Sequence, residues 1–191
     1  TGTLTNESIL LEYYMDILGN ESQKVLDFSY LNSLYHTGVK NHLDSAVLQC
    51  REMPGHERYF QELADRHQKL DELPFDYERR FASVLVRHEE ENLLIIKGSI
   101  DEVCRRCSSV EYKGQRHEFS GDGAESVRAI VDEMLEDGMK VLAVAYKPLK
   151  EATLSQEDEH DFILLGYLAF FDAPKESAAG AIRKLQKLHV E

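Results

Sequence analysis

The chain has 191 residues, and its 35 acidic and 22 basic side chains give a formal net charge of −13. Nucleic acids and anionic membrane surfaces bind basic proteins, so this charge argues against either as the main partner. The longest apolar run, Phe162–Phe171, is far shorter than the ~20 residues that a membrane span requires.

The cysteine content and the first residues bear on the cellular compartment and on whether the chain is part of a longer protein. Three cysteines without a scaffold-like spacing favour a reducing compartment, and no basic-then-apolar leader is visible. We therefore expect a soluble, acidic, cytosolic protein whose length fits one domain. Because the sequence starts at Thr1 rather than at a methionine, we also expect a piece of a longer protein.

The first part of the chain reads as one strand followed by helices. Apolar side chains alternate with period two over residues 9–18, which predicts a strand that ends at Gly19. Helical spacing then predicts helices over residues 25–35, 43–51 and 57–70.

The second part contains strands that come in pairs. Two strands, over residues 80–88 and 92–97, are joined by an acidic turn and predict an antiparallel hairpin. Further elements are expected as a helix over 100–108, a strand pair turning at Lys113-Gly114, a helix ending at Gly138, strands over 140–147 and 161–171, and a helix over 175–189. Paired strands with helices between the pairs indicate an α+β fold, a mainly antiparallel sheet flanked by helices.

Three segments carry candidate chemistry. Residues 1–5 read TGTLT, residues 75–84 read FDYERRFASV, and residues 97–99 read KGS where a buried strand gives way to a helix. Glycine at such a turn allows a ligand to approach the backbone, and lysine supplies a point charge for phosphate. Taken singly, the segments are also explained by a flexible end, a solvated strand edge and a surface turn.

Together and in this order, the segments resemble the nucleotide-binding domain of P-type cation-transporting ATPases. The family's phosphorylation signature is DKTGTLT, and this chain opens with its last five letters. Residues 97–101, KGSID, are similar to the family's KGAPE, and residues 172–175, DAPK, resemble its DPPR hinge. Residues 73–80, LPFDYERR, look closest to the bacterial magnesium-transporting branch.

The resemblance implies an adenine pocket. Phe75 would stack on the base, and Lys97 would line the bottom of the pocket. Gly98 would keep the wall low enough for the purine, and Asp44 would accept a hydrogen bond from the adenine amino group. An aromatic platform of this kind contributes about 1–3 kcal/mol per base.

The resemblance also implies basic residues for the phosphates. Arg80 would lie near the phosphate chain, and Lys140 would reach the β-phosphate. Because the chain carries a net charge of −13, a triphosphate needs a local cluster of basic residues and a magnesium counter-ion. We expect Arg79, Arg80, Arg87, Lys97 and Lys140 to converge.

Parts of the family's machinery would lie outside the chain. The nucleophilic aspartate would precede Thr1, and the family's later acidic magnesium motifs would follow Glu191. Thr1 would help to hold magnesium in the whole protein. The resemblance thus implies that this chain binds ATP, ADP and Mg²⁺ without turning ATP over.

The same resemblance implies an organisation and partners. Residues 1–7 would end the phosphorylation segment and form a first hinge, residues 8–166 would bind nucleotide, and residues 167–191 would form the second hinge. The expected partners are the phosphorylation and actuator domains of the same pump. The chain would be a cytoplasmic domain of an inner or plasma membrane protein, without membrane contact of its own.

Two other classes of protein compete with this interpretation. The chain would be a non-catalytic acidic module for a basic partner if the motif matches were coincidental. It would be a complete small phosphotransferase if its nucleophile lay elsewhere. Cys104 and Cys107 form a CxxC without a second pair, which argues against a metal or redox centre. The acidic residues 156–161 are expected to form a solvated loop.

Overall fold

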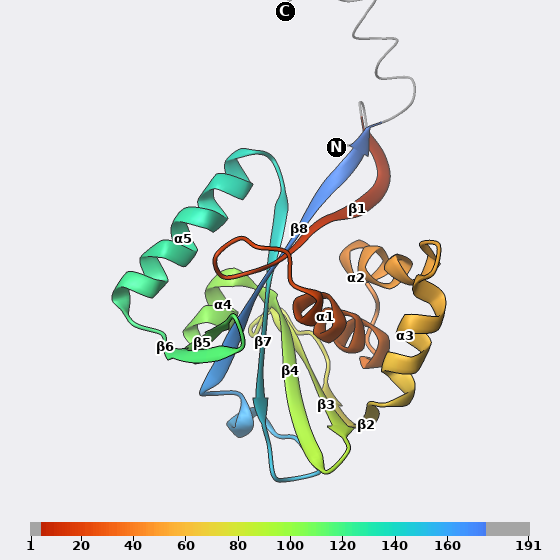
Figure 1. The fold of residues 1–191 in the computed structure, drawn as a ribbon, viewed down its shortest axis with the longest axis vertical. Helices are drawn as coiled ribbons and strands as arrows, with labels where there is room; N and C mark the ends of the chain where they lie inside the picture. Colours follow the sequence, from red (N-terminus) through yellow and green to blue (C-terminus); the bar gives the residue numbers. More distant parts are fainter. Residues whose placement is uncertain (1–4, 175–191) are drawn as a thin grey trace, which may run out of the picture.

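The computed structural model describes residues 5–174, in which an eight-stranded sheet lies between two groups of helices (Figure 1). The strands are β1 (Thr5–Asp16), β2 (Gln68–Leu73), β3 (Phe81–His88), β4 (Glu91–Ser99), β5 (Cys107–Tyr112), β6 (Gln115–Glu118), β7 (Lys140–Pro148) and β8 (Phe162–Pro174). Their order is β2-β3-β4-β7-β8-β5-β6, with β1 also paired to β8. Only β5 and β8 pair in parallel among these described strands, which confirms the predicted mainly antiparallel α+β fold.

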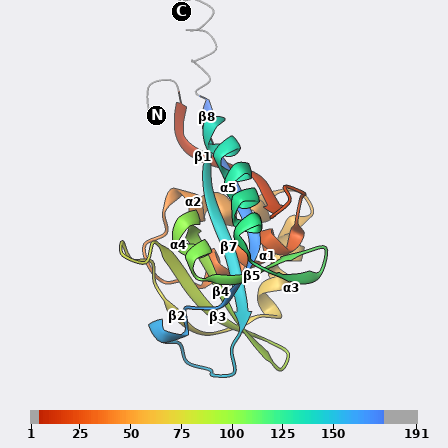
Figure 2. The same cartoon turned by 90° about the vertical axis from the view of Figure 1, so that its left-hand side faces the viewer.

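The helices divide between the two faces of the sheet (Figure 1). One face is covered by α1 (Gln23–Tyr35), α2 (His42–Leu48), the short 3₁₀ helix η1 (Gln49–Glu52) and α3 (His56–Asp65). The other face carries α4 (Ile100–Arg105) and α5 (Gly121–Glu136), and α5 lies along β7 (Figure 2). A second 3₁₀ helix, η2 (Gln156–Asp158), precedes β8.

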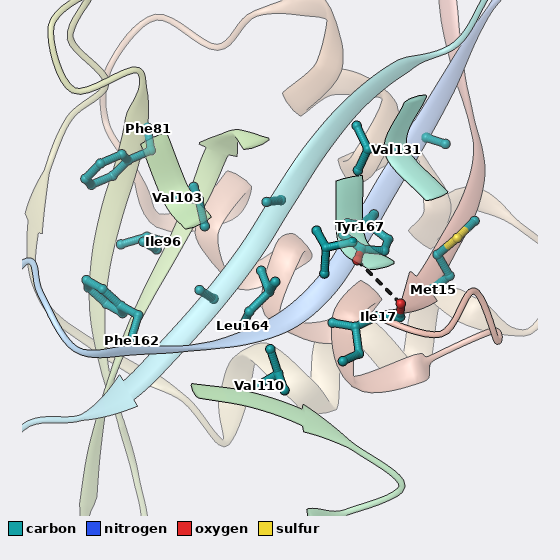
Figure 3. Packing of buried hydrophobic residues seen from close by; sticks show 14 of the residues in the cluster. Met15, Ile17, Phe81, Ile96, Val103, Val110, Val131, Phe162, Leu164 and Tyr167 are labelled. Carbon is teal, nitrogen blue, oxygen red and sulfur yellow. Dashed lines mark hydrogen bonds between the residues drawn. The ribbon is translucent and has the colours of Figure 1, made fainter. Parts of the chain in front are cut away.

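Both faces of the central strands are buried, which explains their nearly continuous apolar sequences. In β4, Leu94 and Ile96 join the core beneath α4 and α5, whereas Leu93 and Ile95 join the core beneath α1 to α3. Figure 3 shows the first of these cores, in which the Tyr167 hydroxyl donates to the Ile17 carbonyl at 3.5 Å. β4 is therefore packed on both sides just before Lys97 and Gly98.

One predicted helix proves partly wrong. Instead of continuing to residue 70, α3 ends at Asp65, and residues 68–73 form β2. This strand pairs with β3 at the edge of the sheet, and most of its side chains are only half buried. A charged segment with helical spacing takes the extended form here because β3 offers it a hydrogen-bonding partner. Similarly, α4 stops at Arg105, two residues before β5 begins.

The two ends of the described chain lie side by side. β1 and β8 extend together beyond the other strands, and Thr5 pairs with Pro174 (Figure 1). β8 passes without a break through residues 166 and 167, where a domain boundary is predicted. The predicted helix over 175–189 lies outside the described residues. No helix in residues 5–174 is long and apolar enough to cross a membrane.

Candidate functional site

A cavity of about 1030 Å³ opens where the ends of several elements meet. Its volume suits a ligand larger than a lone base. Five of the six predicted nucleotide-binding residues line it: Asp44, Phe75, Arg80, Lys97 and Gly98. The sixth, Lys140, does not line it, although Val141 and Leu142, which follow it in β7, do.

A buried group of polar side chains, which we call the floor, consists of Ser33, His36, Asp44 and Lys97. The last three line the cavity, and Ser33 contacts both Asp44 and Lys97. The Lys97 Nζ donates to Asp44 Oδ1 at 2.9 Å and also to the Ser33 hydroxyl. Ser33 in turn donates to Asp44 Oδ1 at 2.8 Å, and His36 Nε2 lies 3.1 Å from Asp44 Oδ2. Lys97 is 5% exposed and Asp44 is 7% exposed, so both charges are shielded from water.

Asp44 stays ionised because its hydrogen-bonding and charged partners favour the carboxylate more than burial disfavours it. Burial alone would raise the pKa of Asp44, but the hydrogen bond from His36 and the charge of Lys97 hold that pKa well below its ordinary value. The backbone N–H of Asn41 adds a fourth donor at 3.3 Å. A carboxylate accepts about four hydrogen bonds, so no acceptor position on Asp44 remains for an adenine amino group in this arrangement.

Two helix ends bring the floor together. α1 ends at Tyr35, so Ser33 lies in its last turn and His36 caps it. α2 begins with a capping box, in which Asn41 accepts from the Asp44 N–H at 2.9 Å and Asp44 accepts from the Asn41 N–H. The sequence N-x-x-D indicates such a capping box and therefore the start of α2. It does not indicate that Asp44 also pairs with Lys97.

Gly98 is required by the backbone opposite it. It pairs with Phe81 across β3 and β4. A Cβ at Gly98 would lie 2.2 Å from the Arg80 carbonyl oxygen and 2.5 Å from the Phe81 Cβ. Those atoms belong to backbone or to a fully buried residue, so this glycine allows the close approach of two strands whether or not a ligand is bound.

The mouth of the cavity is formed by Phe75, Tyr77 and Arg80, which we call the rim. Phe75 is 47% exposed, so one part of its ring faces solvent and the rest is covered by the protein. The Tyr77 ring stands edge-on to it, with centroids 5.8 Å apart, and is 90% exposed. Arg80, at φ 58°, ends the turn and accepts the Ser99 N–H on its carbonyl at 2.9 Å. Rim and floor thus meet at Gly98 and Ser99.

The predicted cluster of basic residues forms only in part. Arg80 and Lys97 line the cavity, whereas Arg79 is buried in an ion pair with Glu159, with N–O distances of 2.6 and 2.8 Å. Arg87 donates to Asn92, on the neighbouring strand, at 3.0 Å. The prediction of five converging cations is therefore wrong.

The acidic segment before β8 also differs from the prediction. Glu159 is 2% exposed rather than solvated, because Arg79 and Ser83 both donate to its carboxylate. Its partner lies 80 residues away in the sequence, so no local pattern could reveal this contact.

The opposite wall comes from α5, α4 and β7. Arg128 lines the cavity, and its guanidinium lies 3.0 Å from Asp101 and 3.8 Å from Asp132. Val131 and Leu135 follow along the same face of α5. The Lys140 amine, 53% exposed, lies 3.9 Å from the Asp172 carboxylate. Arg128 was not predicted, because it lies outside the segments that resemble the family's motifs.

Other candidate chemistry finds little support in the described part of the chain. Residues 5–174 contain no group of three His, Cys, Asp or Glu side chains placed to hold a metal. Thr1, which was predicted to contact magnesium, lies outside these residues. Burial raises the pKa of Cys104 to about 11 and raises the pKa of Cys107 as well, so both sulfurs stay as weakly nucleophilic thiols.

Comparison with known proteins agrees with the motifs. A sequence model described as P-type ATPase, cytoplasmic domain N, matches residues 17–177. The magnesium-transporting ATPase, P-type 1, of Escherichia coli is 41% identical over 189 residues, which cover 97% of this chain and 21% of that protein. The protein of the same name from Salmonella typhimurium is 41% identical over 190 residues, with 97% and 20% covered.

A calcium-transporting relative is similar to this chain over a shorter stretch and at lower identity. Calcium-transporting ATPase 1 of Lactococcus lactis is 31% identical over 134 residues, which cover 69% of this chain and 15% of that protein. The chain spans about a fifth of the length of the magnesium-transporting relatives it matches. The family predicted from the motifs is thereby confirmed, and the chain belongs to the P-type cation-transporting ATPases as a cytoplasmic domain N, with the magnesium-transporting branch among its relatives.

Proposed function

We propose that the chain binds ATP in the cavity and presents it to an aspartate on the phosphorylation domain of the same magnesium-transporting pump. The observation that carries this proposal is the meeting of a half-exposed Phe75 with Lys97 and Gly98 around one cavity. The base would stack on the Phe75 ring, and the purine edge would lie against the end of β4. ATP would arrive with Mg²⁺ as its counter-ion.

Charge placement supports a direction for the phosphates. Lys97 is already neutralised by Asp44, so it is a poor partner for a triphosphate. Arg80 is exposed at the rim, and Lys140 begins the strand whose next residues line the cavity. We propose that the base lies over the floor and that the phosphates extend toward Arg80 and Lys140.

The pairing of β1 with β8 supports the place of this domain in a larger protein. Thr5 and Pro174 are partners in the β1–β8 ladder, so the domain is fitted to insertion into another domain through two adjacent crossings. We propose that the two crossings are formed by residues 1–7 and by the part of residues 167–191 that follows the buried stretch 167–170 of β8, and that the whole pump lies in an inner or plasma membrane with this domain in the cytoplasm.

A titration of the 191-residue chain with ATP, ADP and AMP, followed by backbone amide signals, tests the proposal. We expect weak binding, with Kd of the order of 1 mM, or about −4 kcal/mol, and shifts centred on Phe75 and Lys97. Phe75→Ala should weaken all three nucleotides alike, by about 1–3 kcal/mol, because they share the adenine.

The matched control is Met53→Ala, since Met53 is similarly exposed (55%) but does not line the cavity. Silence at both Phe75 and Lys97 would favour an acidic interaction module instead. Turnover of ATP by the chain alone would favour a complete phosphotransferase.

A further inference from the structure

The Phe75 ring stands on a turn that is fixed by one buried guanidinium. The Arg79 Nη1 donates to the Pro74 carbonyl oxygen and to the Asp76 carboxylate, each at 2.8 Å. These are the residues immediately before and after Phe75. The same side chain therefore holds both neighbours of the aromatic ring, while the ring itself stays 47% exposed.

Backbone hydrogen bonds complete the turn around Asp76. The Asp76 Oδ1 accepts the N–H groups of Glu78 at 2.9 Å and of Arg79 at 2.7 Å, and the Asp76 carbonyl accepts the Arg80 N–H at 2.8 Å. The turn is thus tied to Arg79 through both its side chain and its backbone.

Arg79 is in turn fixed by a residue from a distant part of the chain. Its Nε and Nη2 donate to the two carboxylate oxygens of Glu159 at 2.8 and 2.6 Å, a bidentate pair of defined geometry. The Ser83 hydroxyl also donates to Glu159 Oε1, at 2.6 Å. Arg79 is 8% exposed and Glu159 is 2% exposed, so water does not compete for these contacts.

We propose that Glu159 is a positioning residue for nucleotide binding, because it holds the Arg79 guanidinium that pins both neighbours of Phe75. This inference rests on the proposed function, in which the nucleotide base stacks on the Phe75 ring of the rim. Without the Glu159 charge, Arg79 loses the partner that sets its plane, and the turn no longer presents the ring in one orientation. Glu159 itself does not line the cavity.

A double-mutant cycle on the 191-residue chain tests this role. Wild type, Phe75→Ala, Glu159→Gln and the double variant are titrated with ATP and AMP. We expect Glu159→Gln to weaken both nucleotides by the same factor, at least about threefold, and to add no loss in the Phe75→Ala background. A merely structural defect would not show this dependence on Phe75.

Val110→Ala is the matched control. It shortens a buried side chain (4% exposed) on β5, far along the sheet from β3, so it should lower stability while leaving the affinity of the folded chain unchanged. If Glu159→Gln does not fold, Ser83→Ala removes one donor to Glu159 without leaving an unpaired charge. It should then show a smaller loss of affinity with the same dependence on Phe75.

The outcomes separate the two proposals. If Phe75→Ala binds nucleotide as wild type does, the proposed function fails and this inference fails with it. If Phe75→Ala weakens binding but the folded Glu159→Gln variant, or Ser83→Ala in its place, binds as wild type does, only this inference is overturned. This inference is also overturned if Glu159→Gln lowers the affinity by the same factor in the wild-type and Phe75→Ala backgrounds.

Discussion

The floor and the rim of the cavity adjoin each other but are built in opposite ways. In the floor, Asp44 and Lys97 are almost fully buried and satisfy each other's charge. In the rim, Phe75, Tyr77 and Arg80 stand in solvent on a turn that is fixed from behind. From this contrast we expect substitutions in the floor to lower the stability of the fold, and substitutions in the rim to lower the affinity for nucleotide.

The largest effect is expected from the floor. Asp44→Ala leaves the Lys97 ammonium buried without its carboxylate, and breaking a buried pair in this way costs about 3–5 kcal/mol of unfolding free energy. Urea unfolding measures the loss. The control is Arg58→Ala, which breaks the exposed pair with Glu62 and should cost less than about 1 kcal/mol. A loss for Asp44→Ala as small as that control would contradict the contrast between floor and rim.

The same carboxylate predicts a dependence on pH. Because the folded pKa of Asp44 lies well below its ordinary value, its contribution is complete above the unfolded pKa of about 3.9 and fades as the pH falls below it. The unfolding free energy of wild type should thus decline more steeply from pH 5 downward than that of Asp44→Asn. The difference in slope should not exceed about 1.4 kcal/mol per pH unit.

An intermediate effect is expected where floor and rim meet. Gly98→Ala places a Cβ against the Arg80 carbonyl and Phe81, and overpacking of this kind costs about 1–3 kcal/mol. The matched control is Gly121→Ala at the start of α5, where a Cβ would meet nothing within 4 Å. That change should be neutral or stabilising by up to about 1 kcal/mol. Thermal unfolding of the two variants compares them, and similar midpoints would show that the strands can move apart at Gly98.

Much of the fold was predictable because its signals are local. Alternating and helical apolar patterns predicted β1, the β3–β4 hairpin and α1, and the structure confirms these elements. β2 was missed because an edge strand is selected by the neighbour it pairs with rather than by its own charged sequence. The pattern over residues 57–70 was therefore extended into a helix that stops at Asp65.

The candidate site was predictable in its residues but not in their partnerships. The motifs located Phe75, Lys97 and Gly98, and the structure places all three around one cavity. They did not reveal that Asp44 neutralises Lys97, or that of the adjacent Arg79 and Arg80 only the second reaches the cavity. Each of these facts depends on a side chain more than 50 residues away, which no spacing rule detects.

The smallest effect concerns two exposed cations on the α5 and β7 side of the cavity, Arg128 and Lys140. Arg128 lines the cavity, but Asp101 and Asp132 already offset its charge. Among the residues that the structure describes, the Lys140 amine faces the Asp172 carboxylate, at the longer distance of 3.9 Å, so a phosphate can compete for this amine. We therefore expect Lys140→Ala to weaken ADP and ATP more than AMP, by about 0.2–1 kcal/mol, the usual range for an exposed ion pair.

Arg128→Ala is the matched comparison, because it removes an equally exposed cation from the wall of the same cavity. It should change the three affinities little and alike, since two carboxylates already compensate the lost charge. The ratio of the ADP and AMP dissociation constants, measured for both variants at low and high salt, separates them. Screening should shrink the Lys140 effect, and an effect insensitive to salt would mean that Lys140 acts through the β1–β8 ladder rather than on the phosphates. A larger ratio change for Arg128→Ala would place the phosphates along α5 and remove Lys140 from the proposed site.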